Sequence, residues 1–272
     1  AVGSVVRFTG NPEAPPAAAT DWYLNGPVLG TFIWPRPTER RYHGRYVRTR
    51  TCSNGESPIL VRYPPADDLV HHSTSLDHLL VTLSNMRVIV SKVPEQFTPN
   101  WSAGLGLEFR QDLGGIQDVE TRKAIAEALS FLLGRQLLHI GFTSFDSLGQ
   151  PLEEQAVDPW GDDVVATCQA PGWPPLRLPW EADESERIIS SLIQSYVSLR
   201  DDLDLSDVLW AYWVGLRMPL GFELPLFGLA LERLMAAWFR SNRSRSSGVY
   251  MSAAKFEQLT AEPFMQVERQ LG

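Results

Sequence analysis

The sequence predicts an α+β protein in which an N-terminal antiparallel β domain is followed by a C-terminal helical bundle. Residues 1–115 are rich in β-branched and aromatic runs that are separated by Pro, Gly, Asn and Asp. Further along the chain, apolar residues recur with helical spacing. We therefore expect a β-rich domain over residues 1–115, an α/β connecting segment with a Pro- and Trp-rich loop over residues 116–180, and a helical bundle over residues 181–272.

Five runs in the N-terminal part have the composition of strands. They are VVRFTG, VLGTFIW, HGRYVRTRTC, SPILVRYP and HLLVTLSNMRVIVSKV. Asn54 and Gly55 lie between two of these runs and are typical of a tight hairpin turn, because both residues tolerate positive φ. The Pro- and Ala-rich residues 11–21 are expected to form a loop.

Residues 118–133 are expected to form the first helix, and Gly134 can end it. Its apolar positions recur with a spacing of three or four, at Ile125, Leu129, Leu132 and Leu133. A strand should follow within RQLLHIGFTSF, and then a turn over residues 147–151. The Pro- and Gly-rich residues 151–180 are expected to form a loop.

The chain after residue 180 is expected to be helical. Asp183 and Glu186 have the spacing of a capping box, and Ser206 is expected to cap the next helix. Pro225 suits the first turn of a third helix. The apolar stripe of that helix should pack as the core of a bundle and consists of Phe227, Leu231, Leu234 and Trp238. A last helical segment is expected over residues 253–271.

The apolar stretch over residues 212–247 does not have the pattern of a membrane span. A span needs about 20 consecutive apolar residues, and this run is interrupted by Pro219, Gly221, Glu223 and Pro225. No membrane partner is expected.

Two carboxylates in this stretch lie among apolar residues, where an unpaired charge is costly. We expect Glu223 to lie at a helix N-terminus and Glu232 to form an ion pair. The candidate partners of Glu232 are Arg233, Arg200 and Arg217.

The net charge of −8 argues against a protein that coats nucleic acid in general. The charge is unevenly spread, with +2 over residues 1–110, −6 over residues 111–180 and −4 over residues 181–272. A polyanion would therefore meet the N-terminal part first. Cys52 and Cys168 form no disulfide framework and the chain shows no signal peptide, so a reducing cytoplasm is expected.

The segment RPTERRYHGRYVRTR is the candidate binding site. Arginine interleaved with aromatic residues is typical of contact with phosphates and single strands. Its basic and aromatic residues are Arg36, Arg40, Arg41, Tyr42, Arg45, Tyr46, Arg48 and Arg50. We expect them to bind nucleic acid or a phosphate-bearing ligand; a solvated hairpin face, which would also accommodate Glu39, is the alternative. No cofactor is expected.

Histidine offers two weaker candidates. His71, His72 and His78 lie near Asp77 and suggest a metal-dependent hydrolase, but their spacing matches no recognised metal site, so a solvent-facing loop is favoured. In the second candidate, Arg135 and His139 would share one face of a strand in a structural role. The sequence has no phosphate loop, dinucleotide fingerprint or nucleophile elbow.

The order of these parts resembles bacterial defence proteins of the ApeA type. The stretches that carry the resemblance are EALSFLLGRQLLHIGFTSFDSLGQP and ELPLFGLALERLMAAW. ApeA-type proteins join a β-rich N-terminal domain to a C-terminal HEPN domain, a helical bundle found in many prokaryotic RNA-cleaving toxins and defence proteins. The resemblance covers most of the chain in layout and implies an RNA-related role and a homodimer formed through the bundle.

The HEPN ribonucleases act through an Arg-x4–6-His motif, and this sequence departs from it. No histidine follows His139, and Arg135-x3-His139 has a different spacing and precedes the bundle. No active-site residue can therefore be carried over. The resemblance thus implies a non-catalytic sensing or scaffold module. The alternatives are a protein-interaction module without a nucleic-acid role and an RNase whose catalytic end is missing from this chain.

Overall fold

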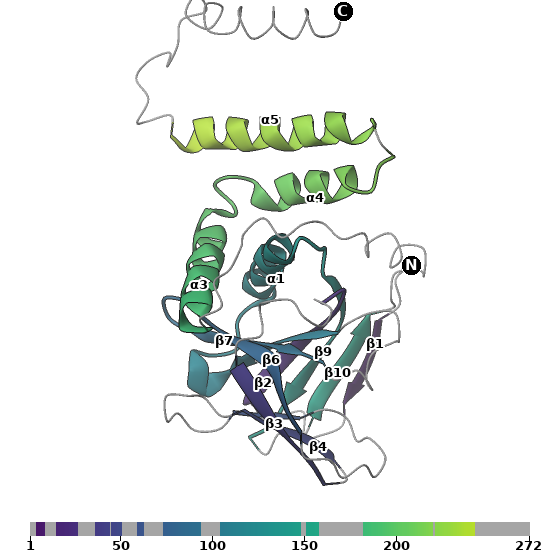
Figure 1. The fold of residues 1–272 in the computed structure, drawn as a ribbon, viewed down its shortest axis with the longest axis vertical. Helices are drawn as coiled ribbons and strands as arrows, with labels where there is room; N and C mark the ends of the chain where they lie inside the picture. Colours follow the sequence, from purple (N-terminus) through teal and green to yellow (C-terminus); the bar gives the residue numbers. More distant parts are fainter. Residues whose placement is uncertain are drawn as a thin grey trace, which may run out of the picture.

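The computed structural model describes residues 4–8, 15–26, 36–43, 45–50, 59–62, 73–93, 104–147, 151–157, 182–219 and 221–242. The predicted α+β class is confirmed, since a large antiparallel sheet is followed by a group of helices (Figure 1). The elements in chain order are β1 (Ser4–Phe8), β2 (Ala18–Leu24), β3 (Arg36–His43), β4 (Arg45–Arg50), β5 (Ile59–Arg62), β6 (Ser73–Thr82), β7 (Arg87–Lys92), β8 (Leu105–Arg110), the 3-10 helix η2 (Gln111–Leu113), α1 (Val119–Leu133), β9 (Leu138–Phe145), β10 (Pro151–Val157), α3 (Ala182–Leu199), α4 (Leu205–Gly215) and α5 (Glu223–Ser241).

The ten strands of the described residues form one sheet in the order β1-β10-β9-β2-β8-β7-β6-β3-β4-β5. All neighbouring strands are antiparallel. The late strands β9 and β10 lie between β1 and β2, so residues 138–157 share a sheet with the N-terminal strands. The division at residues 115 and 180 stays a prediction.

Two loop predictions are wrong because strand pairing overrides local composition. Residues 18–21 belong to β2, which is hydrogen-bonded to β8 on one side and β9 on the other. Residues 151–157 form β10, which begins at Pro151, where the missing N–H is tolerated. The expected strand over residues 28–34, the Asn54-Gly55 turn and the helical segment over residues 253–271 lie outside the described residues.

The first helix confirms its local prediction. The Asp118 carboxylate accepts from the Thr121 N–H at 2.9 Å and so caps α1. Gly134 ends the helix in the left-handed region at φ 62. One face of α1 is buried against the sheet. Its core contributors include Ala124, Ile125, Ala128, Leu129, Leu132 and Leu133.

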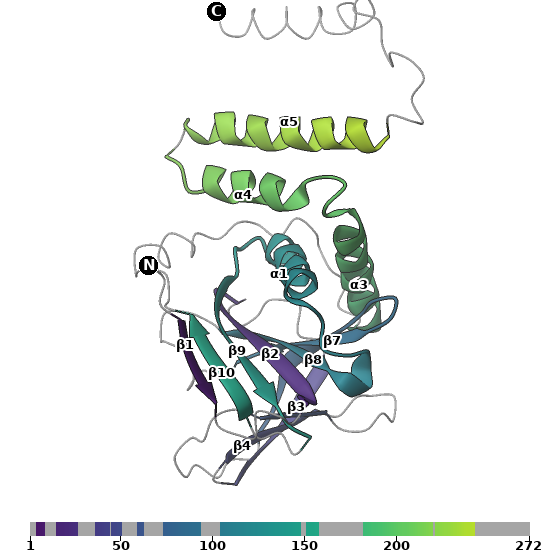
Figure 2. The same cartoon turned by 180° about the vertical axis from the view of Figure 1, so that it is seen from behind.

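The main core lies between the sheet and the helices α1, α3 and α4. Figures 1 and 2 show α1 and α3 on the same side of the central strands, with α4 above them. The largest fully buried core side chains from the strands are Leu79, Ile89, Leu105, Leu107 and Phe109. From α3 they are Ile189 and Ile193.

Two predicted caps have other roles. Asp183 and Glu186 both lie inside α3, and the Glu186 carboxylate accepts from the Leu80 N–H of β6 at 2.9 Å. Ser206 lies inside α4, and its hydroxyl donates to Glu127 of α1 at 2.9 Å. The capping predictions are therefore wrong, because the side chains of Glu186 and Ser206 bind a neighbouring element instead of their own helix end.

Helix α5 packs on α4 (Figure 2). Pro225 lies in its first turn as predicted, and Glu223 is its first residue.

Arg233 pairs with Asp207 of α4 at 2.6 Å, so the predicted pairing of Glu232 with Arg233 is wrong. Arg200 does not pair with Glu232 either, since it binds Glu127 of α1. Asp204 and Arg240 form a second ion pair between α4 and α5.

The predicted apolar stripe of α5 is divided between two surfaces. Phe227 and Leu234 are half-buried, whereas Leu231 and Trp238 are exposed. Small residues make the close contact with α4, since Ala230 and Ala237 are the buried residues of the helix. The interpretation of α5 as a core helix is therefore wrong for the described residues. None of the described helices combines the length and apolar character needed to cross a membrane.

Candidate functional site

The arginine-rich segment forms the β3–β4 hairpin. Residues 38–43 pair with residues 45–50 in an antiparallel register. On its outer sides the hairpin is continued by β6 and β5, so the segment is held within the sheet. The hairpin lies at the end of the molecule opposite α5 (Figures 1 and 2).

The register of this hairpin sorts the predicted binding residues by face. Residues directly paired across antiparallel strands share a face, and successive residues alternate between faces. Arg40 pairs with Arg48, and Tyr42 pairs with Tyr46. These four positions therefore belong to one face, together with Arg50, which pairs with Thr38.

The remaining residues of the hairpin belong to its other face. Arg41 pairs with Val47, and His43 pairs with Arg45. Glu39, the acidic residue of the segment, pairs with Thr49 on this second face. The register thus assigns three arginine positions and both tyrosine positions to one face and the position of Glu39 to the other. Arg36 lies at the start of β3, opposite His78 of β6.

The histidine cluster does not form a metal site in the described residues. His71 and His72 lie outside the described residues. His78 is buried in β6, opposite Ser91 of β7, so the expectation of a solvent-facing loop is wrong for this residue. No group of three or more His, Cys, Asp or Glu side chains in the described part could hold a metal ion.

Arg135 and His139 do not share a strand. Arg135 lies in the turn after α1, where its N–H donates to the Ser130 carbonyl at 3.0 Å. His139 lies in β9, and its Nε2 is 3.5 Å from Oδ1 of Asp21. The Asp21 side chain is 4% exposed and that of His139 is 40% exposed.

Asp21 also binds α1, which the sequence did not reveal. The guanidinium of Arg122 lies 3.4 Å from Oδ2 of Asp21 and 4.6 Å from the centre of the Phe142 ring. Tyr23 lies beside His139, with ring centroids 5.2 Å apart, and its burial, together with the charge of Asp21, raises the pKa of its hydroxyl. A carboxylate that orients an imidazole is an arrangement used in acid–base catalysis.

Asp21, Arg122 and His139 form a cluster with a structural role. The guanidinium of Arg122 neutralises the buried carboxylate of Asp21, and the cluster thereby links β2, β9 and α1. No signal in the sequence could have identified the cluster, because Asp21 is more than a hundred residues from both Arg122 and His139 and meets them only through the pairing of β2 with β9 and the packing of α1.

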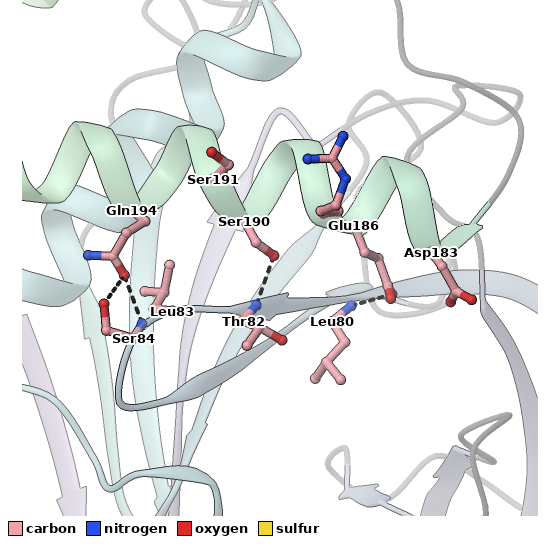
Figure 3. A pocket seen from close by; sticks show the side chains of 10 residues that line it. Leu80, Thr82, Leu83, Ser84, Asp183, Glu186, Ser190, Ser191 and Gln194 are labelled. Atoms are coloured by element: carbon pink, nitrogen blue, oxygen red, sulfur yellow. Dashed lines mark hydrogen bonds between the residues drawn. The ribbon is translucent and has the colours of Figure 1, made fainter.

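A groove of about 660 Å³ lies between β6 and α3. Three α3 side chains accept backbone N–H groups of the strand region: Glu186 from Leu80 at 2.9 Å, Ser190 from Thr82 at 2.9 Å, and Gln194 from Ser84 at 2.8 Å (Figure 3).

The spacing of these contacts has a geometric reason. Four residues of a helix rise about 6.0 Å, and two residues of a strand rise about 6.7 Å. Every fourth side chain of α3 therefore meets every second N–H at the end of β6 and in the turn that follows it. Among the described residues, the pairing of β3 with β6 ends at His78, and beyond that point the side chains of α3 accept the N–H groups of the strand edge. Three of the polar side chains that line the groove, those of Glu186, Ser190 and Gln194, therefore bind the edge of the sheet.

Comparison of the chain with protein-family models, curated proteins and solved structures finds no match. The assignment of a function therefore rests on the residues and their placement. Of the surfaces described, the Arg and Tyr face of the β3–β4 hairpin has the clearest ligand chemistry.

Proposed function

We propose that the protein is a non-catalytic sensing or scaffold module that binds single-stranded RNA on the β3–β4 hairpin. The observation that carries the proposal is the register of that hairpin, which assigns Arg40, Tyr42, Tyr46, Arg48 and Arg50 to one face.

This combination of residues suits an unpaired strand. Arginine presents a planar fork of donors to phosphate oxygens, and an aromatic ring stacks on a base that is free of a duplex partner. The two tyrosine positions are direct partners across the hairpin, and arginine positions of the same face occur on both strands. Stacking is tolerant of sequence, and we expect little preference among bases.

The charge distribution restricts the interaction to this part of the chain. Residues 36–50 hold six arginines and one glutamate, whereas the chain as a whole carries −8. A polyanion is therefore attracted to the hairpin and repelled from the acidic remainder. The same local attraction would act on a phosphate-bearing small ligand, which competition experiments can distinguish from RNA.

The wider role follows from the resemblance to ApeA-type proteins. A β-rich part that precedes helices supports a place in a bacterial antiviral defence system that targets RNA, acting in the cytoplasm. In this role the hairpin senses RNA, and the HEPN-like helical part pairs with a second copy of the chain.

Two variants that make the same change in charge on opposite faces of the hairpin test the proposal. We expect Arg40→Glu/Arg48→Glu to weaken binding of a short fluorescent single-stranded RNA at least tenfold by fluorescence polarisation. Arg41→Glu/Arg45→Glu, on the other face, should retain most of the affinity. Unlabelled single strands should compete, whereas duplex RNA and free nucleotide should not.

Three results would contradict the proposal. Equal losses in the two variants would reduce the interaction to general attraction between charges. Competition by free nucleotide would assign the face to a small ligand. Absence of binding at low salt would leave the hairpin as solvated surface.

A further inference from the structure

We infer that the Arg and Tyr face of the hairpin recognises ribose 2′-hydroxyls and therefore prefers RNA to single-stranded DNA. The inference rests on the proposed function and names the residues that determine the choice of sugar. They are the hydroxyl residues that the register assigns to this face: Thr38 of β3 and Ser73 and Ser75 of β6.

Strand β6 extends the Arg and Tyr face on one side of the hairpin. Ser73 pairs with Arg40, and Ser75 pairs with Thr38. Because directly paired residues share a face, both serine positions belong to the face of Arg40. Thr74, which lies between them, pairs with Glu39 and belongs to the other face.

Two rows of positions result, and each row contains a hydroxyl residue beside an arginine. They run across β6, β3 and β4, with Ser73, Arg40 and Arg48 in the first row and Ser75, Thr38 and Arg50 in the second. Neighbouring strands lie about 4.8 Å apart, and two residues along a strand rise about 6.7 Å. The pair of hydroxyl and basic positions is therefore repeated at an interval of about 6.7 Å.

This repeat suits the backbone of an RNA strand. Each nucleotide carries one phosphate and, in RNA but not in DNA, a 2′-hydroxyl that can donate and accept a hydrogen bond. A stacked strand rises about 3.4 Å per nucleotide, and an extended strand separates its nucleotides further, so one nucleotide can meet each row. An arginine can then bind the phosphate, and a Ser or Thr hydroxyl can bind the ribose.

The two sides of the hairpin differ in chemical character. On the side away from β6 the same two rows continue into β5, where Arg48 pairs with Val61 and Arg50 pairs with Ile59. Hydroxyl positions therefore flank the arginine positions toward β6, and apolar positions flank them toward β5. We expect the sugar–phosphate backbone to follow β3 and β6, with the bases toward β4 and β5.

The Arg and Tyr face is not the face of the sheet that packs against the helices. Leu79 of β6 belongs to the core shared with α1 and α3, so its neighbour His78 belongs to the opposite face. His78 pairs with Arg36, and positions 38, 40 and 42 share the face of Arg36; the irregular pairing at this point adds a residue to β6 and not to β3. Because His78 is itself 1% exposed, we place the contacts on the two rows nearer the turn of the hairpin.

Fluorescence polarisation with matched oligonucleotides tests the preference. Short oligocytidylate and its deoxy counterpart carry the same bases and differ only in the sugar. One hydrogen bond contributes about a factor of five to the affinity, so two 2′-hydroxyl contacts should make the RNA bind about 25-fold more tightly. A 2′-fluoro strand keeps the sugar pucker of RNA but has no donor, and it should bind about as weakly as the DNA.

Two sets of variants remove hydroxyls from opposite faces. Thr38→Val/Ser73→Ala/Ser75→Ala should lower the affinity for RNA to that for DNA and leave the affinity for DNA within a few-fold. Thr49→Val/Thr74→Val, on the face of Glu39, should retain the preference for RNA. Retained DNA binding also shows that the hairpin of a variant is folded. If the triple variant does not fold, Ser73→Ala alone should reduce the preference about fivefold.

Equal affinity of the wild type for RNA and DNA would overturn the inference and leave binding by the hairpin standing. A preference that survives the triple variant, or that both sets of variants lose, would overturn it too. A 2′-fluoro strand that binds as tightly as RNA would assign the preference to sugar pucker and not to the hydroxyl. Binding of neither strand at low salt would instead contradict the proposed function, so the two failures are distinguishable.

Discussion

Replacement of Glu127 by glutamine should weaken the contacts of α1 with α3 and α4 and so destabilise the protein. The Glu127 carboxylate of α1 accepts from Arg200 Nε at 2.7 Å and Nη2 at 3.2 Å. It also accepts from the Tyr196 hydroxyl of α3 at 3.0 Å and from the Ser206 hydroxyl of α4 at 2.9 Å. One side chain therefore joins three helices.

The magnitude follows from the burial of this ion pair. The side chains of Glu127 and Arg200 are 18% and 13% exposed. Removal of one partner of a fully buried pair costs about 3–5 kcal/mol. An amide retains part of the hydrogen bonding, and Arg200 keeps a contact to Glu120 at 3.4 Å. We therefore expect Glu127→Gln to lower the free energy of unfolding by roughly 2 kcal/mol, the range of one or two charge-assisted hydrogen bonds.

The loss of unfolding free energy in Glu127→Gln should depend on pH, and the direction of the Glu127 pKa shift determines whether it grows or shrinks as the pH falls. Burial raises the pKa of Glu127, but the hydrogen bonds from Arg200, Ser206 and Tyr196 and the charge of Arg200 outweigh it, so the folded pKa lies below the usual value. A carboxyl with a depressed folded pKa contributes stability above its unfolded pKa of about 4.3, and the contribution is lost as the pH falls through the folded value. The difference between wild type and Glu127→Gln should therefore be full at pH 7 and shrink below about pH 4.

Urea unfolding, followed by tryptophan fluorescence and by circular dichroism, measures this difference at each pH. Glu184→Gln is the matched control, because Glu184 pairs with Arg187 on the exposed surface of α3 and should leave the midpoint unchanged. A Glu127→Gln midpoint equal to that of wild type would refute the reasoning. So would a difference that persists undiminished at pH 3.

Two further predictions concern the contacts of the sheet. Glu186→Ala removes the acceptor of the Leu80 N–H and should lower the free energy of unfolding by about 1–3 kcal/mol. Ser191→Ala, on the exposed side of the same helix, should have no effect. Equal unfolding midpoints of these two variants would contradict the edge-covering role of α3. Gly114→Ala should destabilise the protein by more than 1 kcal/mol, because φ is 109 and the new Cβ would collide with the Asn85 carbonyl; an unchanged melting temperature would show that the turn relaxes.

Local signals in the sequence predicted the elements whose ends are set by neighbouring residues. The first helix begins at the Asp118 cap and ends at Gly134, because both interactions lie within one turn of the helix. The run HLLVTLSNMRVIVSKV was correctly predicted to be β-structure, and the structure divides it into β6 and β7. Pro225 marked the first turn of α5 because its missing N–H is tolerated there.

Side chains with distant partners were misread. Glu186 and Ser206 have the residue types of caps, yet the first binds a strand edge 106 residues away and the second binds α1, 79 residues away. Residues 18–21 form a strand only because β8 and β9 flank them. Such roles depend on the tertiary arrangement, which local spacing does not encode.

The candidate site shows the same division. Composition was sufficient to identify the arginine-rich segment, but its sorting into two faces required the register of β3 with β4. The α5 stripe had the right period, but the sequence could not show that only part of it faces α4. Phe227 and Leu234 lie toward that helix, whereas Leu231 and Trp238 do not.

The salt dependence of RNA binding tests the central claim most directly. If Arg40, Arg48 and Arg50 each neutralise a phosphate, the logarithm of the association constant should fall with the logarithm of the salt concentration with a slope of about −2, at roughly −0.7 per phosphate of a single strand. Arg40→Glu/Arg48→Glu should reduce that slope to about −0.7 or abolish binding, and Arg41→Glu/Arg45→Glu should leave it near −2. A flat salt dependence, or the same slope in both variants, would contradict RNA binding by this face of the hairpin.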